Sequence, residues 1–454
     1  MLALLCYLQS ILLVFSFYLL WTCYPRHTKA SETRDTRDVA SQEHTKNPHE
    51  LIDAYADLVK NDGAGRWPPR AKHHSWPCAL RPYHDIYLEL APLLSNEPPS
   101  LDDEYNTERR NEFRSRMRKL LNERIDVAQV RKILLAVEAG NWDVIDRDVY
   151  NGFYSCVAVS RHAYRWATIP VVKVAQQEKF IDFPLALAMP WPFLQRNFGV
   201  TAESGNHTSN LTLNYDEWGN RVYWINVSRS DEVISTEGNF NRMVYSVEER
   251  AVPAYRDMIG AVLSFTENDR ALCLACLRGT SWKLREILKS YFDNMTDARV
   301  SRAKWMSYVQ GFQAWAAGEM VNGEYVEYDG LSGNHVLFFQ ALDAFLGFDR
   351  YLSDVDFVRY IPARQRNLCT TFRKHSFRHQ LKPERDAVML KEFETIVFRM
   401  AHRKRSMTYL QAPAPERLIM TAGKSVLEVE GCNDLDVLLK PLEDLMTSRL
   451  KATV

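Results

Sequence analysis

The sequence predicts an all-α protein of two helical domains, and three observations support that prediction. Apolar residues recur every three or four positions over most of the chain after residue 100, which is the pattern of helices with one buried face. The least helical stretch, 199–237, separates two such regions and is where we place the domain join. Hydrophobic residues make up 46% of the 454 positions, enough for a proper core.

The first segment, 1–24, is predicted to be a single transmembrane anchor. It is almost uninterrupted apolar sequence, close to the ~20 residues that span a bilayer. Basic residues follow it from Arg26 onward, so the positive-inside rule puts the catalytic body in the cytosol. A cleaved signal peptide is the alternative, although its basic start and small-residue cleavage site are not clear. Glycosylation sequons would instead indicate the lumen if used, and they occur at Asn206, Asn210, Asn226 and Asn294.

The remaining chain divides into three predicted parts. Residues 25–65 are polar and charged, which is typical of a flexible linker. Residues 66–235 form a smaller helical domain, and 236–454 a larger one. A β-hairpin is expected near the join, with strands at 211–215 and 221–227 around a turn at Gly219-Asn220. The larger domain should contain helices at 243–264, 267–291, 298–318, 334–348, 385–410 and 433–447.

Charge and cysteine content narrow the functional classes. Lys+Arg and Asp+Glu both number 57, and this balance argues against nucleic acid as the main partner. The eight cysteines show no disulfide or zinc-ribbon spacing, which suits a reducing compartment. Cys273 and Cys276 lie in an apolar helical run and are expected to be buried thiols.

The predicted helix 385–410 carries the most informative histidine. Its apolar residues form one stripe, and His402 lies on nearly the opposite face with Arg399 one turn earlier. One interpretation is a solvated histidine in the basic run 402–405. The other is an axial haem ligand, with Arg399 pairing a propionate.

Several segments, taken in order, resemble one known family. Phe398–His402, followed by Tyr409, resembles the proximal-histidine helix of the indoleamine 2,3-dioxygenase family. Phe339–Gly347 resembles that family's F-Q-x-x-D-x-x-L-G helix, and 330–334 its Gly/Ser-rich distal loop. Tyr360–Leu368 resembles its Y-x-P-x-x-x-R-N-x segment. Each motif is weak alone, but the ordered set is specific and extends, thinly at first, from Trp67 to the C-terminus.

The resemblance implies a haem enzyme. It implies haem b held by His402 as the metal ligand, with O2 as co-substrate and an electron donor that reduces ferric haem. The reaction would be cleavage of the C2–C3 bond of tryptophan or an indole derivative. His335 could also enter the distal side. The residues that would contact the haem by this resemblance are Arg399, Asp343, Ser332, Gly333 and Asn334.

The distal residues depart from the family pattern. Trp305 keeps an aromatic that can stack on an indole, but the position of the family's carboxylate-binding arginine falls on Gln310. The family's distal serine falls near Tyr245 or Ser246, which the match does not separate. The predicted substrate contacts are therefore Trp305, Gln310, Tyr245 and Ser332. Free tryptophan is therefore in doubt as the substrate, and an indole without a free carboxylate, such as an amine, amide or peptide-derived ring, becomes a second candidate. No catalytic acid or base is identified.

Three alternatives stay open. A monooxygenase or rearrangement enzyme of secondary metabolism could use the same haem scaffold. A membrane-tethered haem-binding or sensing protein would need no turnover. A helical scaffold without a cofactor would leave His402 as a surface residue.

Overall fold

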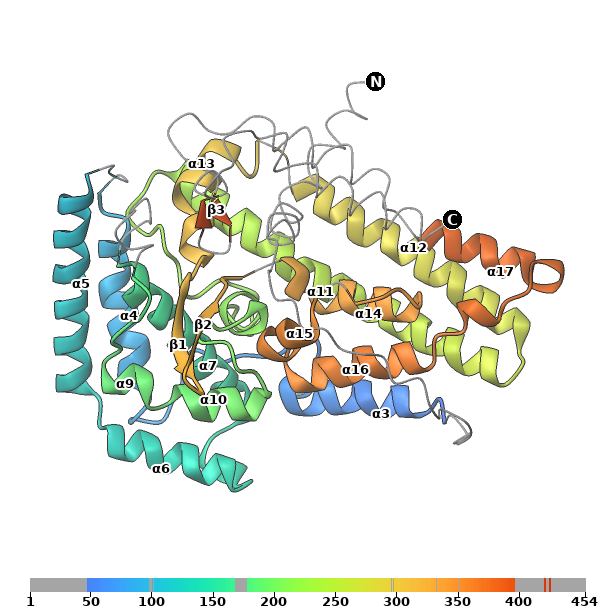
Figure 1. Cartoon of the computed structure of the whole chain (residues 1–454), viewed down its shortest axis with the longest axis horizontal. Helices are drawn as coiled ribbons and strands as arrows, with labels where there is room; N and C mark the ends of the chain where they lie inside the picture. The colour runs from blue at the N-terminus through green and yellow to red at the C-terminus, as the bar shows by residue number, and fades with distance from the viewer. Residues whose placement is uncertain are drawn as a thin grey trace.

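The computed structural model describes residues 47–97, 100, 102–167, 178–294, 296, 298–331, 333–350, 352–396, 420–421 and 424–425. This part of the chain is mostly helical, so the predicted all-α class is confirmed at that level (Figure 1). Among the described helices, none is long and apolar enough to cross a membrane. The predicted anchor, 1–24, lies outside the described residues.

The helices follow the chain in two groups. The first group is α3 (Glu50–Asp57), α4 (Arg81–Leu94), α5 (Asp103–Arg124), α6 (Val127–Glu138), α7 (Arg147–Trp166), α9 (Leu185–Ala188) and α10 (Trp191–Phe198). The second is α11 (Asp231–Thr266), α12 (Arg270–Asn294), α13 (Arg302–Tyr308), α14 (Leu337–Phe345), α15 (Asp354–Tyr360), α16 (Ala363–Lys374) and α17 (Pro383–Ile396). Short π or 3₁₀ turns are η1 (Leu58–Asp62), η2 (Trp142–Val144), η3 (Thr208–Thr212), η4 (Gln310–Gln313), η5 (Gly333–His335) and η6 (Arg378–Gln380).

Two large hydrophobic clusters form the interior. The first gathers α4, α5, α6, α7 and α10, and α7 is buried along nearly its whole length. The second gathers α11, α12, α14, α16 and α17, with α11 and α12 forming a long helical pair (Figure 1). The division at 235/236 stays a prediction, because Phe312 and Ala314 pack in the first cluster while Trp67 packs in the second.

Local sequence accounts for several helix starts. Asp102 accepts hydrogen bonds from the backbone N–H groups of Glu104 and Tyr105, so it caps α5. Asp126 caps α6 in the same way. An N-cap carboxylate satisfies N–H groups that have no partner within the helix, which defines where the helix begins.

The predicted flexible linker, 25–65, is wrong for its described part. From Glu50 the chain forms α3, which packs against α16 (Figure 1). Leu51 and Leu58 are fully buried in the second cluster, and Lys374 pairs with Glu50. The few apolar residues of this polar stretch lie on one helical face, and composition alone does not reveal that spacing.

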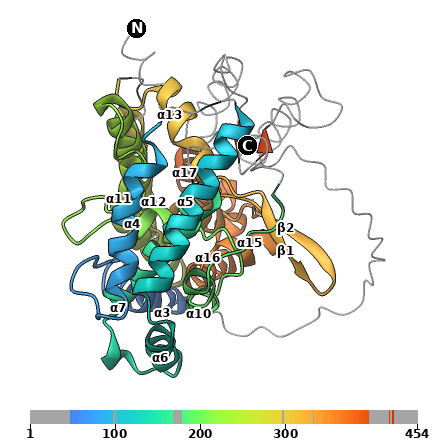
Figure 2. The same ribbon diagram turned by 90° about the vertical axis from the view of Figure 1, so that its left-hand side faces the viewer.

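The predicted hairpin at 211–227 is also wrong in place. That segment contains η3 and one isolated antiparallel bridge between Tyr215 and Arg221. The two-stranded sheet instead pairs β1 (Ala317–Val321) with β2 (Glu324–Tyr328), and it projects from one side of the helical body (Figure 2). A second short pair joins β3 (Met420–Thr421) to β4 (Lys424–Ser425).

The turn at Asn322-Gly323 explains where the sheet forms. Both residues have positive φ, 51° and 86°, which is the geometry of the tight hairpin turn that Asn-Gly prefers. The helix predicted over 298–318 is shorter in the structure. Helix α13 stops at Tyr308, and strand β1 begins at Ala317.

Helix α11 carries two buried carboxylates that join distant segments. Glu237 binds Arg221 at 2.9 Å and accepts hydrogen bonds from the backbone N–H groups of Ile225 and Asn226. Glu248 accepts hydrogen bonds from Trp67 Nε1 at 2.9 Å, Tyr255 Oη at 3.1 Å and the Phe338 backbone N at 2.9 Å. Burial raises the pKa of Glu248 above its ordinary value, and these donors oppose the shift.

Substitution of Glu248 tests this junction. Glu248→Ala should lower the free energy of unfolding by about 3 kcal/mol or more, because three buried donors lose their acceptor. Glu249→Ala is the matched control: its exposed pair with Arg242 should contribute about 1 kcal/mol or less. Chemical denaturation of both variants measures the difference, and equal losses would contradict a junction role for Glu248.

Candidate functional site

The two residues predicted for the proximal side, His402 and Arg399, lie outside the described residues. In the predicted distal loop, Ser332 also lies outside them, and of Asn334 only the backbone is described, in η5. The iron ligand, the propionate partner and these loop contacts stay predictions. The structure does describe the other residues predicted for the distal side.

Trp305 is buried beside a second aromatic residue, Phe240, and we call this pair the aromatic wall. Its ring is 1% exposed and packs on Phe240 of α11, with 5.3 Å between ring centroids. Val244, one turn after Phe240, belongs to the same hydrophobic cluster. Sequence reasoning missed Phe240 and Val244, although their four-residue spacing on a long helix indicates a shared face.

Tyr245 does not join Trp305. Its hydroxyl accepts a hydrogen bond from Arg66 at 3.2 Å, and its ring packs on Tyr215 at 4.5 Å between centroids. Five residues along a helix rotate the side chain by about 140° from Phe240, so the two point in different directions. The structure therefore separates Tyr245 from Trp305, and the contact of Tyr245 with a substrate stays a prediction.

Gln310 is buried in η4, at 4% exposure. The same short helix contains Phe312, whose carbonyl oxygen lies 2.9 Å from His162 Nδ1. His162 is thereby a packed, hydrogen-bonded core histidine between α7 and η4. Gln310 thus contributes a buried neutral amide, and its role in substrate binding stays a prediction.

Asp343 of α14 interacts electrostatically with Arg373 of α16. Burial lowers the pKa of Arg373 on α16, Arg350 lowers it further, and Asp343 opposes this shift. An electrostatic link between α14 and α16 is thus present. Contact with Arg399 stays a prediction, and the two roles are compatible.

A polar loop, 204–214, is buried between the two clusters. Loops usually lie on the surface because their polar groups need partners. Here Asn206 and Ser209 exchange backbone–side-chain hydrogen bonds, and Gln365 of α16 donates to Thr208 at 2.9 Å. The polar residues of this loop with at most 4% exposure are Ser204, Asn206, His207, Thr208, Ser209, Asn210, Thr212 and Asn214.

Two buried histidines, His207 of this loop and His335 of η5, interact electrostatically. His335 stacks on Tyr360 with 4.7 Å between centroids and a 12° angle between planes. Burial lowers the pKa of His335 from 6.5 to about 3, and His207 lowers it further. Burial likewise lowers the pKa of His207 to about 3. Both imidazoles are therefore uncharged at neutral pH.

Leu331 and Val336 flank η5 and are buried, and the imidazoles of His207 and His335 are uncharged at neutral pH. Gly330 serves the chain's own packing, since a Cβ there would lie 2.2 Å from the Gln313 carbonyl oxygen. Within the described residues, no group of three or more His, Cys, Asp or Glu side chains could hold a metal ion.

The sequons at Asn206, Asn210 and Asn226 lie inside the folded protein. Asn206 and Asn226 are 0% exposed and Asn210 is 2% exposed. A glycan at any of them would have to displace the core, so these tripeptides give no support to a lumenal orientation. The membrane orientation itself stays a prediction.

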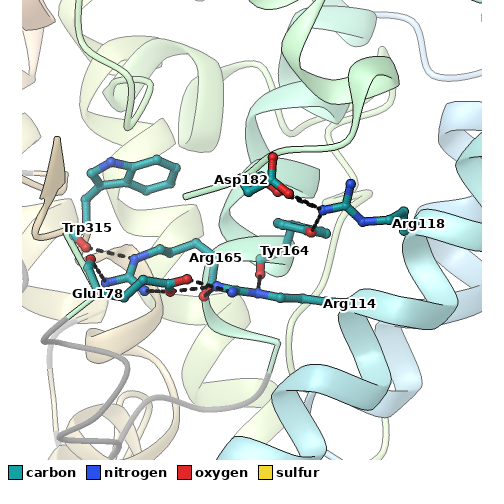
Figure 3. A network of polar contacts seen from close by, with 7 residues as sticks. All are labelled: Arg114, Arg118, Tyr164, Arg165, Glu178, Asp182 and Trp315. Carbon is teal, nitrogen blue, oxygen red and sulfur yellow. Dashed lines mark hydrogen bonds and ion pairs between the residues drawn. The ribbon is translucent and has the colours of Figure 1, made fainter. Parts of the chain in front are cut away.

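A charged cluster between α5 and α7 is structural (Figure 3). Arg165 is buried, pairs with Glu178 at 2.8 Å and donates to the Trp315 carbonyl oxygen at 3.2 Å. Arg114 pairs with the same carboxylate at 2.8 Å and donates to the carbonyl oxygens of Tyr164 and Arg165. The Glu178 carboxylate is thus shared by two guanidinium groups, which fastens the segment before α9 to both α5 and α7.

Comparison with known proteins finds no matching family model and no significant match among curated proteins. The residue motifs and the geometry above therefore carry the functional argument.

The neutral histidines predict a specific acid sensitivity. A buried His with a folded pKa of about 3 takes up its proton more readily when unfolded, so its stabilising contribution is complete above pH 6.5 and is lost as pH falls toward 3. Each such residue should lower the free energy of unfolding by up to about 1.4 kcal/mol per pH unit in that window.

His335→Phe should therefore flatten the fall in stability between pH 6.5 and 4. His74→Gln is the control, because His74 is well exposed and lies outside this loop. Denaturation midpoints measured across this range test the effect. An unchanged slope in His335→Phe would show that His335 is already charged or exposed in the native protein.

Proposed function

We propose that this protein is a haem-dependent dioxygenase of the indoleamine 2,3-dioxygenase type, acting on tryptophan or an indole derivative. The observation that carries the proposal is the ordered set of motifs from 330 to 409. The packing is compatible with it, because the motif helix α14 and the aromatic residue Trp305 belong to one hydrophobic cluster with α11.

His402 would hold the haem iron, Arg399 would pair with a propionate, and Asp343 would orient Arg399. Haem b would supply the redox-active iron through which O2 is activated, with an external electron donor keeping it ferrous. The chain's own part is positioning. Trp305 and Phe240 provide an aromatic wall for an indole, and Leu331 and Val336 keep water from the distal side.

The buried amide of Gln310 bears on the substrate. Losing a bidentate guanidinium clamp should cost roughly a few kcal/mol of carboxylate binding. We therefore propose an indole amine, amide or peptide-derived ring rather than free tryptophan. The predicted anchor, 1–24, would hold this activity at a membrane with the catalytic domain in the cytosol.

The haem spectrum tests the ligand assignment. Purified full-length protein should show a Soret band, and His402→Ala should lose most of its haem because the iron loses its axial nitrogen. His379→Ala is the control, since His379 is exposed. Unchanged haem content and Soret position in His402→Ala would remove His402 as the ligand.

Gln310→Arg tests the substrate argument. Wild type should bind L-tryptophanamide at least as tightly as L-tryptophan, whereas the variant should improve L-tryptophan binding about tenfold relative to the amide. Gln310→Met, similar in size but uncharged, should show no such change. Thermal melts of both variants separate binding from folding. Strong preference of wild type for L-tryptophan would overturn the argument.

A further inference from the structure

Asp62 is a buried carboxylate at a point where three separate parts of the chain meet. It ends η1, and its side chain is 1% exposed. Arg364 of α16 donates to its Oδ1 at 2.8 Å. Its backbone carbonyl oxygen accepts a hydrogen bond from Asn151 of α7 at 2.9 Å. Since α7 belongs to the first hydrophobic cluster and α16 to the second, this one residue connects the N-terminal segment to both.

The Asp62 carboxylate has few partners for a group so deeply buried. Its second oxygen, Oδ2, has no hydrogen-bond partner within the described residues. Arg364 is shared between two acids, because its Nε lies 3.2 Å from Asp57 Oδ2. A buried carboxylate with so few donors favours its neutral form, since a proton removes the cost of desolvating the charge. Burial accordingly raises the pKa of Asp62 from 3.8 to about 6, although Arg364 opposes the shift.

Charged groups on each element packed against Asp62 contribute to this balance. Arg364 on α16 and Arg147 on α7 favour the charged carboxylate, whereas Asp57 on α3 disfavours it. Tyr154 on α7 also interacts with Asp62, but burial raises the pKa of Tyr154, so it stays neutral in the acidic range. Arg364 is 30% exposed and keeps Asp57 as a partner. Protonation of Asp62 therefore does not leave the Arg364 charge buried without a partner.

We propose that Asp62 and Arg364 form a proton-operated latch, which holds the N-terminal segment 47–66 on the two clusters more tightly in mildly acidic than in neutral solution. When the segment separates locally from α16, Asp62 enters water and its pKa returns to the ordinary value. The contribution of its proton to the closed form is therefore complete below pH 3.8 and is lost as pH rises toward 6.

The latch bears on the junction at Glu248. Trp67, which donates to Glu248, directly follows the segment that the latch holds. Loosening of 47–66 therefore begins one residue away from this buried contact. The latch needs neither haem nor substrate, so it is independent of the proposed function.

Hydrogen–deuterium exchange of the full-length protein measures the opening. The amides of Gly63 and Gly65 report it, because they donate to the carbonyl oxygens of Leu58 and Val59 in η1. After correction for intrinsic exchange, their opening constant in wild type should be about tenfold lower at pH 5 than at pH 7. Asp62→Asn, whose amide is neutral like the protonated acid, should show no such change. Equal opening constants at both pH values in wild type, or an undiminished change in Asp62→Asn, would overturn the latch.

Two further variants leave Asp62 in place. Asp57→Asn is the matched control: it removes the half-exposed acid that shares Arg364 and should keep a clear fall in the opening constant between pH 7 and pH 5. Arg364→Gln removes the opposing positive charge, so Asp62 should take up its proton at higher pH and the fall should move toward neutral pH. Loss of the pH dependence in Asp57→Asn, or an unshifted curve in Arg364→Gln, would show that another group causes the change and would also contradict the proposal.

Discussion

The position of η5 and of the start of α14 depends on one buried carboxylate. Glu248 accepts hydrogen bonds from Trp67, from Tyr255 and from the first turn of α14 at Phe338. Desolvation of a carboxylate is costly, and only a nearly complete set of donors offsets it. The N-terminal segment, α11 and the start of α14 must therefore meet at one point. Since η5 immediately precedes α14, this junction also decides where Gly333 and His335 lie.

The other polar groups of the interior follow the same principle at the boundary between the hydrophobic clusters. Glu237 organises the chain around Asn226, and Asn206 and Ser209 satisfy each other within the buried loop. Pairing is favoured because a buried polar atom cannot exchange its partner for bulk water. The pairing is incomplete even at this boundary, since Asn226 Oδ1 and His207 Nε2 have no hydrogen-bond partner within the described residues.

The sequence predicts an element well where its apolar residues repeat over several turns. It predicts an element poorly where the position of that element depends on contacts with distant parts of the chain. The one-sided helices α11, α12, α14 and α17 were predictable because their apolar residues recur over several turns. α3 was missed because a short helix in a polar stretch shows only two turns of the pattern. The hairpin at 317–328 was missed although Asn322-Gly323 is a strong turn signal, because the preceding apolar run was read as helix. Its two strands bury few residues, so their composition does not indicate a buried strand.

The predicted site residues were limited in the same way, because the direction and burial of a side chain depend on contacts that the sequence does not show. Uncertainty of one residue in a helical match changes the direction of a side chain by about 100°, so the sequence alone could not decide whether Tyr245 shares a face with Phe240 and Trp305. The burial of His207 could not be predicted either, because the loop that carries it has no period to read and packs against α16, more than a hundred residues away. Burial lowers the pKa of both His207 and His335, so both imidazoles are uncharged at neutral pH. Their neutrality follows from desolvation by distant elements of the chain, which no local sequence pattern encodes.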